Sequence, residues 1–195
     1  MSSLAHYLER LASALEANAK RFEELDSAAG DGDLGITAGK IAEGIRSGIP
    51  LLSGDLKSDL MTIGREISKS APSTFGTLFA TGFIRASGAV SPESSAIENL
   101  RKSLQAACDG VMARGKAQLG ERTLLDALHP AIEALNSASD MKTGLQAAAV
   151  AARAGAISTS EMMPRHGRAG WIGERAKGLE DAGANVIAVA FESAV

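Results

Sequence analysis

Residues 26–37 read D-S-A-A-G-D-G-D-L-G-I-T and separate two stretches in which apolar residues recur every three or four positions. Before this segment the apolar positions run from Leu4 to Leu25, and after it they run from Leu34 to Ile45. Such spacing places the apolar side chains on one face of an α-helix. The segment is therefore predicted to be a glycine-rich turn that joins two helices.

The same period continues through most of the chain. Five further helices are predicted around the apolar stripes Leu56–Ile67, Phe75–Phe83, Ile97–Val111, Leu125–Leu135 and Met141–Ile157. A last apolar run, within residues 185–191, has the length of a buried strand, but no other segment offers a strand to pair with it. We therefore expect an eighth helix there, and one all-α domain over residues 1–195.

Composition limits the class of protein. The chain has 195 residues, 45% of them hydrophobic and only 4% aromatic, with a net charge of −3. A single cysteine, Cys108, excludes an internal disulfide and a cysteine-based zinc site. The small net charge gives no reason to expect a nucleic-acid partner, and no run of apolar residues reaches the length of a membrane span. The amphipathic, charged N-terminus does not resemble a signal peptide, so a cytoplasmic location is expected.

Three carboxylates, from Asp26, Asp31 and Asp33, fall within eight residues, with no lysine or arginine among them. If they converge they repel one another unless a cation neutralises them, and carboxylate oxygens suit Mg²⁺ or Ca²⁺. An EF-hand is excluded, because the twelfth position counted from Asp31 is Ala42, where a glutamate is required. A purely structural alternative remains open, in which Asp31 caps the second helix and the other two are solvated.

The other break in the helical pattern, residues 158–183, is a long loop with a basic excess. Loops of this length inside a compact domain are commonly functional. Arg165, His166 and Arg168 could hold a phosphate there, or the loop could simply be solvated. Residues 70–74, S-A-P-S-T, are either an ordinary helix cap or a second helix N-terminus that binds phosphate.

Four stretches, taken in order, resemble the nucleotide-binding L subunit or domain of dihydroxyacetone kinases. They are LDSAAGDGDLGIT at 25–37, FGTLF at 75–79, GKAQLGERTLLDAL at 115–128, and GRAGWIGER at 167–175 followed by DAGA at 181–184. Together these stretches extend from residue 25 to residue 184. The resemblance implies an antiparallel barrel or bundle of eight helices with a nucleotide, ADP or ATP, bound at one end.

The resemblance also assigns roles to residues. Asp26, Asp31 and Asp33 would hold two Mg²⁺ ions, and Arg168 would act on the transferring phosphoryl group. The nucleotide would contact Leu34, Gly35, Ile36, Thr37, Ser70, Ala71, Gly115, Leu124, Arg168, Asp181, Ala182 and Gly183. Two departures stand out: Leu34 occupies a position where many members have histidine, and Ser70-Ala71 replaces a more glycine-rich turn.

By this resemblance the chain is a kinase subunit that transfers a phosphoryl group to dihydroxyacetone or a related ketose. A separate K-type subunit would hold the substrate. The nucleotide would be either exchangeable ATP or retained ADP that a phosphotransferase-system protein rephosphorylates. A homodimer is among the assemblies that the resemblance allows. A non-catalytic protein of the same fold, which reports nucleotide state to a regulator, is the alternative.

Overall fold

The structure, a computed structural model, describes residues 3–195, apart from the side chains at positions 171, 172, 174 and 175. Its long helices are α1 (Ser3–Ala17), α2 (Ala19–Ala29), α3 (Leu34–Gly48), α4 (Leu56–Ser70), α5 (Thr74–Ala89), α6 (Ala96–Gly115), α7 (Leu125–Ser137), α8 (Met141–Ser158) and α10 (Ala182–Glu192). Short helical turns are η1 (Ile49–Leu51), η2 (Thr159–Glu161), α9 (Ala169–Ile172) and η3 (Gly173–Ala176). No strand occurs in this described part, and none of its helices is long and apolar enough to cross a membrane.

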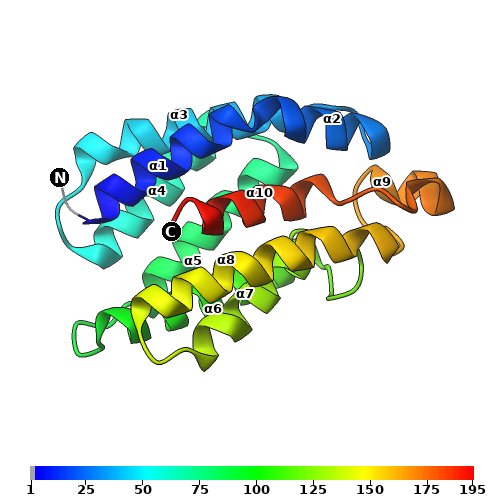
Figure 1. Cartoon of the computed structure of the whole chain (residues 1–195). Coiled ribbons are helices and arrows are strands. Elements are labelled where there is room, and N and C mark those ends of the chain that lie inside the picture. Colours follow the sequence, from blue (N-terminus) through cyan, green and yellow to red (C-terminus); the bar gives the residue numbers. More distant parts are fainter. Residues whose placement is uncertain (1–2) are drawn as a thin grey trace.

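The all-α prediction is confirmed, and each of the eight predicted helices is present, but the chain contains more helices than eight. The first predicted helix is interrupted at Asn18, which separates α1 from α2 (Figure 1). The side-chain amide of Asn18 donates to the carbonyl oxygen of Ala14 at 2.9 Å. Asparagine breaks helices locally because its side chain competes for backbone groups in this way. The short helix α9 lies within the long loop at 158–183, where no helix was predicted.

The long helices form a closed ring. Going round it, α1 packs against α3, α3 against α4, α4 against α5, α5 against α6, α6 against α7 and α7 against α8. Helix α10 then packs against both α8 and α1, which returns the ring to its start (Figure 1). The arrangement is the predicted helical barrel, with α2 continuing α1 toward the end of the molecule where α9 lies.

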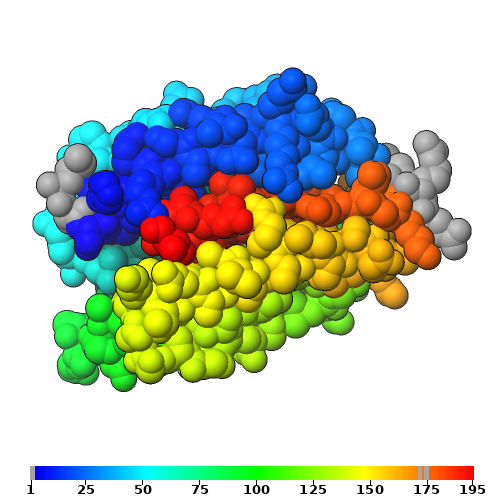
Figure 2. Space-filling model, in the orientation of Figure 1, coloured from blue at the N-terminus to red at the C-terminus, as the bar shows by residue number. Residues whose placement is uncertain are grey.

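Helix α10 explains the ambiguous apolar run near residue 190. Every residue from Ala184 to Phe191 is buried. Val186 and Val189 join a core cluster built mainly from α1, α3 and α4, whereas Ile187 and Phe191 join a second cluster built from α6, α7 and α8. A helix covered on both sides is apolar all round, so it has no polar face to reveal its period. In Figure 2 the end of this helix shows only as a narrow red strip between α1 and α8.

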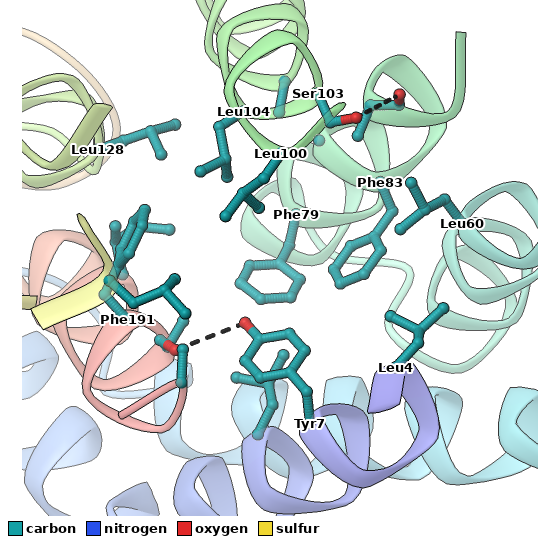
Figure 3. Close-up of a pocket in the computed structure, with 18 of the residues that line it drawn as sticks. Leu4, Tyr7, Leu60, Phe79, Phe83, Leu100, Ser103, Leu104, Leu128 and Phe191 are labelled. Carbon is teal, nitrogen blue, oxygen red and sulfur yellow. Dashed lines mark hydrogen bonds between the residues drawn. The ribbon is translucent and has the colours of Figure 1, made fainter. Parts of the chain in front are cut away.

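The interior of the ring holds an apolar cavity of about 550 Å³. Leu4, Tyr7, Phe79, Phe83 and Phe191 point toward one another across it (Figure 3). The Tyr7 hydroxyl donates to the carbonyl oxygen of Ala190 at 3.5 Å, and burial raises the pKa of Tyr7 to about 12. The phenol is therefore neutral over the physiological range, and the space it faces carries no formal charge from it.

Helix crossings in the ring depend on glycines. At Gly155 in α8, an added Cβ atom would lie 2.2 Å from the carbonyl oxygen of Asp126 in α7. At Gly39 in α3, an added Cβ atom would meet nothing within 4 Å. There is therefore no space for a side chain at Gly155, whereas there is space for one at Gly39.

We expect Gly155→Ala to lower the free energy of unfolding by about 1–3 kcal/mol, because α7 and α8 must separate to admit the methyl group. Gly39→Ala, the matched control, should raise it by about 0.5–1 kcal/mol, because alanine loses less backbone entropy in a helix. Urea denaturation followed by circular dichroism measures both. Equal effects of the two substitutions would contradict the close crossing.

Candidate nucleotide and metal site

The turn between α2 and α3 is shaped by glycine and by Asp26. Gly32 has a φ of +74°, in the left-handed region that L residues rarely adopt. Asp26, in the last turn of α2, accepts a hydrogen bond from the backbone N–H of Leu34 at 3.2 Å. Asp33 is the N-cap residue of α3, but its side chain makes no capping bond. Asp26 therefore ties the two helices together, and the alternative in which Asp31 caps α3 is wrong.

The three aspartates converge. One carboxylate oxygen each from Asp26, Asp31 and Asp33 lies within 4.8 Å of the other two. Asp31 and Asp33 are exposed and Asp26 is half-buried. Carboxylate oxygens are hard ligands. Three of them clustered in this way fit Mg²⁺, which takes a few carboxylates and completes its coordination shell with water or phosphate oxygens. Asp31 also forms an ion pair with Arg168, which reaches the turn from the long loop.

A cavity of about 780 Å³ opens beside these carboxylates. It is lined by all three aspartates and by seven of the residues predicted to contact nucleotide, namely Leu34, Gly115, Leu124, Arg168, Asp181, Ala182 and Gly183. These residues come from α3, from the two ends of the α6–α7 connection, from the long loop and from the start of α10. The structure thus brings together segments that are far apart in the sequence.

Five of the residues predicted to contact nucleotide do not line this cavity. Gly35 faces α2, where an added Cβ atom would lie 2.5 Å from the carbonyl oxygen of Ala19. Ile36 is 64% exposed, and the Thr37 hydroxyl is turned toward the hydroxyl of Ser73 at 3.3 Å. Only a backbone N–H in the first turn of α3 could reach a ligand from this segment.

Ser70 and Ala71 are likewise turned away, and their neighbours take the position. The Ser70 hydroxyl donates to the carbonyl oxygen of Glu66 in its own helix, and Ala71 is buried. Ser73 and Thr74 line the cavity instead. The Ser73 hydroxyl caps α5 by accepting from the N–H of Gly76 at 3.0 Å. The helix N-terminus that faces the cavity is therefore the start of α5, two residues beyond the predicted contact.

Hydrogen bonds hold the long loop at 158–183 in place beside the cavity. Its His166 ring contacts the Glu121 carboxylate at 2.6 Å, and hydrogen bonds from Gln118 N–H and from His166 lower the pKa of that carboxyl group. The N–H of Asp181 donates to the Thr159 hydroxyl at 2.7 Å, which closes the base of the loop. His166 and Arg168 both line the cavity, whereas Arg165 does not.

Several residues that line the cavity escaped the sequence analysis, and Arg122 and Arg114 are two of them. Arg122 lies in the turn before α7, is only 3% exposed and borders the cavity. Arg122 belongs to the stretch GKAQLGERTLLDAL, so the family resemblance had already indicated this part of the chain. An arginine in a polar turn is ordinarily solvated, and nothing in the letters indicates that this guanidinium is buried.

Comparison with protein families identifies this architecture. The DAK2 domain matches residues 28–195, which include Asp31 and Asp33 of the aspartate turn, the α6–α7 connection, the long loop and α10. The chain belongs to the DAK2 domain family.

Individual relatives agree with this assignment. The DAK2 chain is 30% identical to the ADP-binding subunit DhaL of the PEP-dependent dihydroxyacetone kinase of Escherichia coli, over 95% of this chain and 91% of that protein. A corresponding DhaL subunit of Listeria innocua is also 30% identical, over 92% and 87% of the two chains. The dihydroxyacetone kinase of C. freundii, solved in complex with AMP-PNP and Mg²⁺, superimposes with a TM-score of 0.79 and 27% identity. That match covers 99% of this chain and 33% of the C. freundii chain, so the DAK2 chain spans about a third of that enzyme.

Asp181 is an acid of the DAK2 cavity whose pKa is clearly raised. It caps α10 by accepting from the N–H of Ala184 at 2.7 Å. Burial raises its pKa to about 6; the capping bond and Arg122 oppose this rise, and Asp126 and Asp26 add to it. The folded protein therefore holds this proton to higher pH than the unfolded chain does, so the free energy of unfolding falls as the pH rises from the ordinary pKa of 3.8 to about 6 and stays at the lower value above that.

We expect Asp181→Asn, in EDTA, to raise the free energy of unfolding at pH 8 by on the order of 1–2 kcal/mol, because asparagine caps a helix equally well without the buried charge. The gain should largely disappear near pH 4, where the folded protein holds the aspartate protonated and the unfolded chain, with the ordinary pKa of 3.8, is still partly protonated. Asp140→Asn is the matched control. That aspartate caps α8 from an exposed position, and hydrogen bonds from Thr143 lower its pKa, so the control should show no gain at pH 8. A gain of the same size at pH 4 and pH 8 would show that Asp181 is not the ionised group.

Proposed function

We propose that this DAK2 chain is the nucleotide-binding subunit of a kinase that phosphorylates dihydroxyacetone or a related ketose. The observation that carries the proposal is the convergence of three carboxylates at the mouth of a cavity at one end of a helical barrel. The C. freundii relative with the same fold was solved with AMP-PNP and Mg²⁺, and the DhaL relatives are named as ADP-binding subunits.

Asp26, Asp31 and Asp33 would hold two Mg²⁺ ions, which when bound neutralise the β- and γ-phosphate oxygens of the nucleotide. The starts of α5 and α3 both border this cavity, and helix N-termini favour anions. These groups would orient the phosphate chain without any further lysine.

Arg168 is the residue proposed to act on the transferring group. Its guanidinium lies beside Asp31 at the mouth of the cavity and is more than half exposed, so it can leave that carboxylate for a phosphate oxygen. Placed there, it would stabilise the charge that develops during phosphoryl transfer. Its position on the loop also makes this contact depend on closure of the loop.

The nucleoside would occupy the deeper part of the cavity. Gly115 and Leu124 would offer close backbone approach and apolar surface for the adenine, and Asp181, Ala182 and Gly183 line the same cavity at the start of α10. The contacts expected of Leu34–Thr37 would be made through backbone groups, since Leu34 cannot supply the side chain of a histidine.

The substrate and the phosphoryl donor involve other chains. We propose that a separate K-type subunit holds the ketose, and that this chain presents the nucleotide to it. The donor is either exchangeable ATP or ADP rephosphorylated in place by a phosphotransferase-system protein; the E. coli and L. innocua relatives are named as PEP-dependent. A cytoplasmic location, a homodimer and the absence of a nucleic-acid partner belong to the same proposal.

Asp31→Asn and Asp33→Asn should each weaken Mg²⁺-dependent binding of ADP by at least about a hundredfold, because each removes a charged metal ligand. Helical content should stay the same, since both side chains are exposed. Glu24→Gln removes an exposed carboxylate of α2 outside the cavity and is the matched control. Isothermal titration calorimetry with and without Mg²⁺ gives the answer, and unchanged affinity in the aspartate variants would refute the metal assignment.

Phosphoryl transfer is the decisive test of the activity. With a cognate K-type subunit and ³²P-labelled donor, we expect label on dihydroxyacetone or a related ketose, and Arg168→Lys should reduce kcat about 10²–10³-fold while nucleotide affinity falls much less. Arg165→Lys, on the same loop but outside the cavity, should leave kcat unchanged. Tight Mg²⁺-dependent nucleotide binding without transfer to any ketose would favour the regulatory alternative.

A further inference from the structure

Arg122 is held in an unusual position. The turn that carries it is fixed by the buried carboxylate of Asp126, which accepts hydrogen bonds from the N–H groups of Gly120 at 2.6 Å and Thr123 at 2.8 Å. Arg122 itself has a φ of +58°, which is uncommon for a residue other than glycine. The chain therefore folds at some conformational cost so that this side chain points inward, where it is 3% exposed and borders the cavity.

The guanidinium is only partly satisfied. Its Nη2 atom donates to the carbonyl oxygen of Leu179, at the end of the long loop, at 2.9 Å. Its Nε and Nη1 atoms are buried and have no hydrogen-bond partner among the described residues. Within the same described part, no carboxylate lies at ion-pair distance from it. Arg122 thus combines a buried positive charge with two donors that have no partner among the described residues, in a side chain that lines the cavity.

The chain's own acids do not supply the missing partner. Asp181 is near enough to attract the guanidinium electrostatically, but its carboxylate is already engaged in capping α10. Asp126 is engaged in holding the turn. A buried charge that lacks both a counter-charge and hydrogen-bond acceptors is costly. Such a cost is relieved when an anionic ligand enters the space that the side chain borders.

The geometry points to Arg122 as a binding residue for the phosphate chain of the nucleotide, with its free guanidinium donors directed to an anionic oxygen. This inference rests on the proposed function, since it takes the cavity to be the nucleotide site. Arginine suits the role because its guanidinium forms short, charge-assisted hydrogen bonds to phosphate oxygens. The contact would also connect the ligand to the loop, because Nη2 holds Leu179 at the same time.

A series of truncated ligands tests the inference. Calorimetry with Mg²⁺ would compare ATP, ADP, AMP and adenosine as ligands of the native chain, of Arg122→Met and of Arg122→Lys. We expect Arg122→Met to weaken ADP and ATP about 10- to 100-fold and adenosine less than twofold, because ADP and ATP carry a phosphate chain and adenosine carries no phosphate oxygen. Arg122→Lys keeps the charge, so it should recover part of the loss and should fold even if the methionine variant does not.

Arg101→Met is the matched control. Arg101 is a half-buried arginine that donates to the carbonyl oxygens of Leu135 and Ala138 at the end of α7, outside the cavity. Its removal should lower the melting temperature without changing any of the four affinities. Equal losses for all four ligands in the Arg122 variants would mean a structural role only, and no loss for any of them would exclude contact; either result overturns the inference. Failure of the native chain to bind any nucleotide would instead refute the proposed function on which the inference rests.

Discussion

Helix α10 packs against α1 on one side and against α8 on the other, and these two contacts close the ring of helices. This position constrains the sequence of α10, because the helix must bury both of its flanks at once. Val186 and Ile187, adjacent in sequence, belong to different core clusters. Small residues on either side of this pair, such as Ala184, Ala188 and Ala190, let the neighbouring helices approach closely. Without this helix, the ring would be open between α8 and α1.

The same closure builds the functional end of the molecule. Asp181 caps the start of α10 and lines the candidate cavity, so the packing of the helix fixes its position there. The turn between α2 and α3, where Asp26 accepts from the N–H of Leu34, lines the same cavity. The long loop contacts this turn through the ion pair of Arg168 with Asp31, and its Leu179 carbonyl oxygen accepts from Arg122 in the turn before α7. Several contacts that hold the helices and the long loop together therefore also position residues of the candidate site.

Much of this could be predicted from the sequence. The three- and four-residue period located the helices from α3 to α8 and the joint span of α1 and α2, and three aspartates among glycines marked the candidate site. What could not be predicted depends on neighbours in space. The break at Asn18, the burial of Gly35 against α2 and the replacement of Ser70 by Ser73 at the cavity are decided by packing. Arg122 is the clearest example, since burial of a charge is a property of its surroundings and not of the residue.

The apolar cavity inside the ring has a consequence for how the protein responds to pressure. A ring of helices built largely from alanine, leucine and few aromatic residues leaves a cavity with an apolar lining at its centre, where water finds few hydrogen-bond partners. Unfolding removes this poorly hydrated space, so the total volume of protein and solvent shrinks. Hydrostatic pressure therefore acts on this barrel more strongly than on a helical bundle of equal length whose centre is filled.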